Sequence, residues 1–70
     1  MAKYYINTNE GRKYIKEIDY ANGILTFTNY EDEAYRGRDG YYAEATRDLL
    51  RRGFKEEYPE VNNLEYMDDY

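Results

Sequence analysis

The chain contains no cysteine, no histidine and no serine among its 70 residues. Without cysteine no disulfide can stabilise the fold, and nothing indicates an oxidising compartment. The missing residue types also remove the usual general base at neutral pH and two common nucleophiles. No calcium-loop, zinc or phosphate-loop motif is present. We therefore expect a protein that is not an enzyme and that has no cofactor and no metal site.

Long apolar runs are absent as well. No segment approaches the roughly 20 residues of a membrane-spanning helix, and the first residues lack the apolar stretch of a signal peptide. We expect a soluble, cytoplasmic protein with no membrane contact. A chain of 70 residues forms one domain at most, and it buries only about 60 % of its unfolded surface, so its core is thin.

Tyrosine, in contrast, is abundant, with eleven copies. A tyrosine ring supplies a large apolar area and a polar tip, which suits both a small core and a recognition surface. We expect Tyr4, Tyr14, Tyr20 and Tyr42 to fill the core in place of phenylalanine and leucine. Tyrosines next to acidic residues are expected to make contacts with a partner, because a ring and a carboxylate together accept arginine.

Two strands and a hairpin are predicted in the first 28 residues. Residues 3–8 and 13–20 are rich in β-prone side chains, and Asn22-Gly23 is typical of a two-residue hairpin turn. This turn pairs Ile18 with Phe27. The apolar face that results contains Ile18, Tyr20, Leu25 and Phe27.

One residue does not fit this hairpin. Ile15 falls on the polar face, and either a bulge near Lys16 or simple exposure of Ile15 accounts for it.

A helix is predicted over residues 40–52. Asp39 precedes it as a candidate N-cap, cations gather in its last turn, and Gly53 follows it. The expected fold is α+β, with a three-stranded antiparallel meander and one main helix packed on one face. Residues 1–55 form the compact domain. Residues 56–70 form an acidic tail that is either disordered or adds an edge strand.

Negative charge is concentrated in that tail. The whole chain carries −5, whereas residues 1–28 carry +1 and residues 29–55 are neutral. Segregated charge favours docking on a basic surface, where carboxylates take the places of phosphates. The predicted partner-binding residues are Glu56, Glu57, Tyr58, Glu60, Glu65, Tyr66, Asp68, Asp69 and Tyr70, together with Glu31, Asp32 and Glu33.

Three segments carry a resemblance to short phage-encoded proteins: Tyr-Ile-Lys-Glu-Ile-Asp at 14–19, Asn-Gly-Ile-Leu-Thr-Phe-Thr at 22–28 and Glu-Ala-Tyr-Arg at 33–36. The acidity resembles that of anti-CRISPR and anti-restriction inhibitors, several of which are nucleic-acid mimics. The resemblance implies a basic nucleic-acid-binding partner, such as a CRISPR effector or a restriction enzyme. Those inhibitors share no common sequence, so it assigns no residue a role.

Two alternatives stay open. The first is a generic protein–protein interaction or homodimeric assembly module of phage or bacterial origin. The second is direct nucleic-acid binding through Arg47, Arg51, Arg52, Tyr41 and Tyr42, which the net charge of −5 disfavours because phosphate is repelled.

Overall fold

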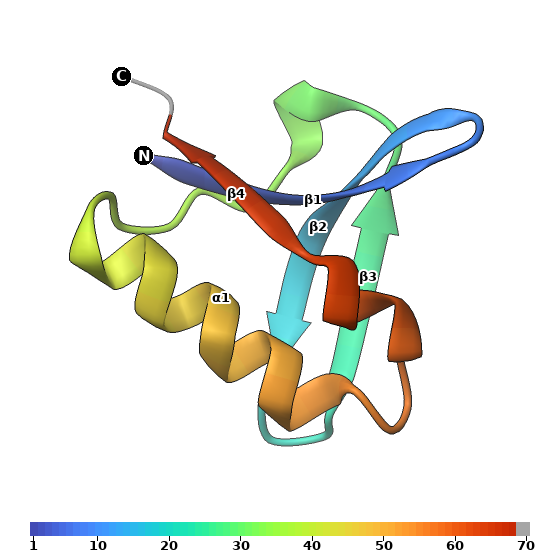
Figure 1. Cartoon of the computed structure of the whole chain (residues 1–70), viewed down its shortest axis with the longest axis vertical. Coiled ribbons are helices and arrows are strands. Elements are labelled where there is room, and N and C mark those ends of the chain that lie inside the picture. Colours follow the sequence, from blue (N-terminus) through green and yellow to red (C-terminus); the bar gives the residue numbers. More distant parts are fainter. Residues whose placement is uncertain (69–70) are drawn as a thin grey trace.

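One helix covers one face of a four-stranded antiparallel sheet in the computed structural model, which describes residues 1–68 (Figure 1). The strands are β1 (Ala2–Thr8), β2 (Gly11–Asp19), β3 (Ile24–Thr28) and β4 (Glu65–Asp68), in the order β3-β2-β1-β4. The first three strands form the predicted meander. β4 pairs with β1, which confirms the α+β class and the added edge strand.

The β2–β3 hairpin differs from the prediction in its register. Ile18 pairs with Leu25, so residues 20–23 form a four-residue connection instead of an Asn-Gly turn alone. The Asp19 carboxylate accepts the backbone N–H of Asn22 at 3.1 Å and its side-chain amide at 2.9 Å. Both bonds lower the pKa of Asp19, and they stabilise the wider turn. Tyr20 lies in this connection, where its ring contacts that of Phe54 with centroids 6.1 Å apart, but it is exposed and does not fill the core as expected.

The predicted bulge in β2 is confirmed. The pairing of β2 with β3 shifts between Ile15 and Glu17, which places the extra residue at Lys16. Because of this shift, Ile15 pairs with Phe27 and points toward the helix side, where it is fully buried.

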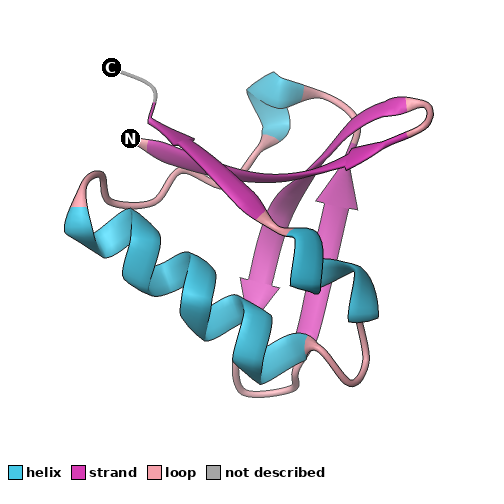
Figure 2. Cartoon of the chain, viewed as in Figure 1, coloured by secondary structure: helices cyan, strands magenta, loops and turns pink. Residues whose placement is uncertain are grey.

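The helical elements are η1 (Glu31–Glu33), α1 (Tyr41–Phe54) and η2 (Pro59–Asn63) (Figure 2). α1 begins one residue later and ends two residues later than predicted. Its N-cap is Gly40, with φ of 67°, and not Asp39. Asp39 instead forms an ion pair with the N-terminal amine at 2.6 Å.

The core lies between α1, η2 and one face of the sheet. Its buried residues are Ala2, Tyr4, Ile6, Ile15, Leu25, Ala43, Leu50, Phe54, Val61 and Leu64. Val61 and Leu64, both fully buried, come from the segment that was expected to be a tail. Residues 56–68 are therefore an integral part of the fold. Tyr42 is half-exposed on α1 and is not in the core, contrary to expectation.

The segment that follows η1 crosses from one face of the sheet to the other, and it passes through the space between strands β1 and β2. Gly37 and Ala2 exchange two backbone hydrogen bonds of 2.9 and 2.8 Å, and the Tyr35 N–H donates to the Ile15 carbonyl at 2.8 Å. A Cβ at residue 37 would lie 3.1 Å from the Tyr35 ring, tighter than ordinary contact, and 3.4 Å from the Tyr4 ring, so glycine relieves the crowding in this passage. The crossing places η1 on the face opposite α1.

Candidate functional site

Three of the predicted partner-binding carboxylates are bound within the molecule. Glu60 Oε2 pairs with Lys13 Nζ at 3.2 Å, and Glu65 pairs with Arg51 at 3.5 Å and with Arg47 at 4.0 Å. A hydrogen bond to its own backbone N–H, together with Lys13, lowers the pKa of Glu60. The third of these carboxylates, on η1, is described below. The C-terminal segment therefore faces cations of its own chain.

Two predicted contact tyrosines also have partners inside the chain. The Tyr66 ring lies under the Arg47 guanidinium, 5.2 Å from its centroid. Tyr58 packs between Phe27 and Phe54, with ring centroids 5.9 and 6.4 Å away. Both tyrosines are half-buried against the core. Whether or not they contact a partner, they hold α1, η2 and β4 together.

The remaining acids of the C-terminal segment stay in solvent. Glu56 and Glu57 are exposed in the connection between α1 and η2, and Asp68 is exposed at the end of β4. Within residues 1–68 none of these three makes an ion pair. Asp69 and Tyr70, which were also predicted to bind the partner, lie outside the described residues.

The best-ordered acidic surface is the turn formed by residues 30–33, which we name the acidic turn. Its anchor is Glu31, whose Oε1 accepts the Tyr14 hydroxyl at 3.2 Å and whose Oε2 pairs with Lys3 Nζ at 3.2 Å. Lys3 is only 4 % exposed. A charged lysine is costly to bury unless it is paired, so this contact ties the acidic turn to β1 and β2.

A second set of bonds fixes the acidic turn to the end of β3. The Thr28 hydroxyl donates to Glu33 Oε1 at 2.7 Å and accepts the Tyr30 N–H at 3.1 Å. The backbone N–H of Glu33 donates to the Tyr30 carbonyl at 3.1 Å. Asp32 is exposed, and the Tyr30 side chain is 67 % exposed. The turn thus presents two carboxylates and one tyrosine ring on a fixed backbone.

The structure does not bring all predicted residues to one surface. η1 lies at the upper end of the molecule in Figure 1, whereas the connection between α1 and η2, with Glu56 and Glu57, lies at the lower end. The predicted acids therefore form separate groups. Within residues 1–68, the acidic turn alone among these groups combines exposed carboxylates with an exposed tyrosine and with side-chain bonds that hold it in place.

Sequence reasoning placed Glu31, Asp32 and Glu33 in the site but missed Tyr30, Lys3 and the anchoring contacts. One signal was available: Lys3 is a lone cation within a strand of alanine, tyrosine and isoleucine. A lysine in such a strand needs an acidic partner when it is buried. The identity of that partner, 28 residues away, has no local signature.

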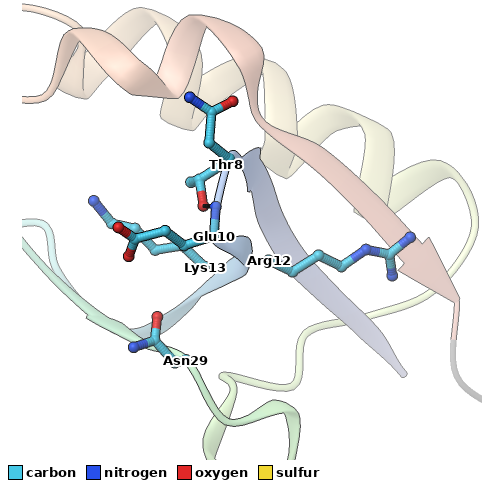
Figure 3. A pocket seen from close by; sticks show the side chains of 6 residues that line it. Thr8, Glu10, Arg12, Lys13 and Asn29 are labelled. Carbon is cyan, nitrogen blue, oxygen red and sulfur yellow. Dashed lines mark hydrogen bonds between the residues drawn. The ribbon is translucent and has the colours of Figure 1, made fainter.

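The hollow beside the β1–β2 turn, about 570 Å³, is a weaker candidate (Figure 3). Its lining includes Thr8, Glu10, Arg12 and Lys13. Arg12 points away from the other side chains in Figure 3 and lies over the Tyr5 ring at 4.1 Å. Lys13 is already paired with an acid and lies 4.2 Å from an aromatic ring. The hollow therefore offers no convergent set of free groups.

Among residues 1–68, no group of three or more acidic side chains is arranged to hold a metal ion. No helix in the same part of the chain is long and apolar enough to cross a membrane. Comparison with protein-family models, with curated proteins and with solved structures found no match for this chain.

Proposed function

We propose that this chain is a non-enzymatic inhibitor that docks on a basic nucleic-acid-binding groove of a host defence protein in the bacterial cytoplasm. The partner class is a CRISPR effector or a restriction enzyme, and carboxylates stand where its nucleic-acid phosphates would lie. The observation that carries the proposal is the acidic turn, which holds Asp32, Glu33 and Tyr30 in solvent on an anchored backbone.

Preorganisation is what distinguishes this surface from an ordinary acidic loop. Binding costs free energy for each side chain and loop that must be ordered. In the acidic turn that ordering is already present, because Glu31 is bonded to Lys3 and Tyr14, and Glu33 is bonded to Thr28. A fixed pair of carboxylates then attracts cations before contact and holds them after contact.

The chemistry of the turn fits arginine in particular. The Lys3 charge offsets that of Glu31, which leaves Asp32 and Glu33 as the two net negative charges. A carboxylate binds the planar guanidinium group through two hydrogen bonds. The exposed Tyr30 ring supplies a face on which the same group stacks. Arginine-lined grooves are what phosphate-binding proteins present.

Capture from a bacterial lysate on the immobilised protein tests this proposal, with D32N/E33Q as the diagnostic variant. Glutamine at position 33 still accepts the Thr28 hydroxyl, so the fold is retained. E56Q/E57Q is the matched control, since it removes the same charge at the opposite end of the molecule. We expect wild type and the control to capture the partner, D32N/E33Q to lose it, and duplex DNA to compete with it.

Two outcomes contradict the proposal. In the first, the captured protein stays bound in excess duplex DNA, so the groove is not the site. In the second, D32N/E33Q captures as much as wild type does. The inhibition itself is measured as DNA cleavage by the captured enzyme, which wild type but not D32N/E33Q should suppress at equimolar amounts.

A further inference from the structure

The outer face of α1 exposes several large apolar side chains among its charged ones. The helix buries Ala43, Leu50 and Phe54 against the sheet. On its other side Tyr41 is 81 %, Tyr42 54 % and Leu49 47 % exposed. Ala45 lies among them and is exposed as well. A surface helix of a small protein usually presents polar residues there, so this face has the composition of an interface.

On the outer face of this helix the acids lie nearer its N-terminus and a cation lies nearer its C-terminus. Glu44 and Asp48 lie in its first two turns, and Arg52 lies in its last. Arg47 contacts Glu44 at 3.8 Å and Asp48 at 3.3 Å, but it also serves Glu65 on β4. Two cations, Arg47 and Arg51, therefore face three carboxylates, those of Glu44, Asp48 and Glu65. This cluster carries a net charge of −1.

Among residues 1–68, Arg52 is the cation of α1 that has no acidic partner. In the described part of the chain it forms no ion pair. It lines a hollow of about 320 Å³ together with Tyr41, Glu44, Ala45 and Asp48. The hollow runs along the outer face, beside the carboxylates that lack a full complement of positive charge.

We propose that α1 binds α1 of a second copy of this chain, antiparallel, through this outer face. In an antiparallel pair, Arg52 of each copy lies beside Glu44 and Asp48 of the other, which matches charge at both ends of the contact. In this register Leu49 packs near the two-fold axis, and the small Ala45 lies opposite Gly53 of the other helix, which lets the helices approach. The same patch is used on both copies, as two-fold symmetry requires. A parallel pair would oppose like charges instead.

The sheet edges are less suited to this contact. At the β3 edge the Leu25 N–H already donates to the Tyr58 hydroxyl at 3.2 Å. β4, the other edge, has four residues. A helix of 14 residues is about 21 Å long, so the α1 contact buries less than about 1,200 Å², which is typical of weak association. The dimer should therefore depend on concentration.

A charge-reversal pair tests the arrangement on the full chain. By sedimentation equilibrium at low salt, the wild-type mass should rise with concentration toward twice the 8.5 kDa of one chain. R52E should remain monomeric, because like charges then meet. E44K/D48K should remain monomeric for the same reason. An equimolar mixture of the two variants should dimerise again, since the outer face of one variant is then acidic and that of the other is basic.

K16E is the matched control, a charge reversal at an exposed position on β2, and it should associate as wild type does. Circular dichroism checks that each variant is folded, and the mixture identifies any variant that is monomeric only because it is damaged. Wild type that stays at 8.5 kDa at every concentration overturns the proposal. So does R52E that associates normally, or a mixture that stays monomeric. The acidic turn is unchanged in these variants, so partner capture remains a separate readout.

Discussion

The Tyr58 hydroxyl is a good place to test the packing of the C-terminal segment, because one atom can be removed there. It accepts the Leu25 N–H at 3.2 Å on the free edge of β3, while its ring packs between Phe27 and Phe54. Tyr58→Phe keeps the ring and removes the acceptor. The backbone N–H of Leu25 then has no protein partner in a part-buried position.

Loss of one such hydrogen bond costs about 1 kcal/mol of the free energy of unfolding. The free energy of unfolding of a chain of this size is roughly 3–5 kcal/mol, so Y58F should remove about a quarter of it. The same change lowers Tm by about 4–8 °C for a domain of this length. The Leu25 amide should also exchange its hydrogen faster, because the local protection is removed.

Urea unfolding followed by circular dichroism measures the free energy, and hydrogen exchange by NMR measures the amide. Y30F is the matched control: it removes a tyrosine hydroxyl from a ring that is exposed, and its stability should equal that of wild type. If Y58F unfolds at the wild-type urea midpoint and Leu25 exchanges at the wild-type rate, the hydroxyl does not hold the strand edge and the reasoning fails.

Three further predictions follow from buried and titrating groups. L64A should lower the free energy of unfolding by about 2–5 kcal/mol, enough to unfold much of the protein without denaturant. If urea unfolding of L64A gives the wild-type midpoint, residues 56–68 are dispensable for stability. Burial raises the pKa of Tyr4 above 10.0, so its contribution is complete below that pH and is lost as pH rises through the folded-state pKa. Y4F should weaken the alkaline fall in stability measured by urea unfolding. The pKa of Glu60 is held below 4.5 by its own backbone N–H and by Lys13, so its contribution is present above that pH and is lost as pH falls through the lowered pKa. E60Q should make stability less dependent on pH in the acid range, and an unchanged profile would refute the role of Glu60.

The parts of the fold that local patterns specify were predicted well. β-prone side chains marked β1 and β2, and of the two explanations for the misfit of Ile15 the structure confirms the bulge at Lys16. The hairpin register failed because Asp19 competes for the turn through its side chain. A hydrogen bond from a side chain to the backbone of a turn competes with the hydrogen bonds of the strand ladder. The preference of Asn-Gly for a two-residue turn does not take this competition into account.

The C-terminal segment was predicted in part: its edge strand is confirmed, but the burial of Val61 and Leu64 was not expected. Val61 and Leu64 are two apolar residues in a polar stretch, and they show no period that would indicate a strand or a helix. Their burial depends on the position of α1 and β1, which no local window contains. A thin core recruits isolated side chains from anywhere in the chain.

The candidate site was predicted only as a set of charges. Net charge and its segregation are visible in the sequence, but which acid is neutralised depends on contacts between distant residues. Glu60 lies 47 residues from Lys13, and Glu65 lies 14 from Arg51. Sequence alone therefore named more free carboxylates than the molecule exposes. The acidic turn is still a candidate site because its anchoring contacts use both oxygens of Glu31 but only one oxygen of Glu33 and none of Asp32.

The pairing of β1 with β4 governs when this molecule can fold. Ala2 lies opposite Asp68, so one edge of β1 stays uncovered until β4 has been made. Until then β1 presents an unpaired row of backbone groups beside Tyr4 and Ile6, in a sheet held by β2 and β3 alone. Chaperone contact with the nascent chain should therefore concentrate on β1 and end when residues 65–68 leave the exit tunnel.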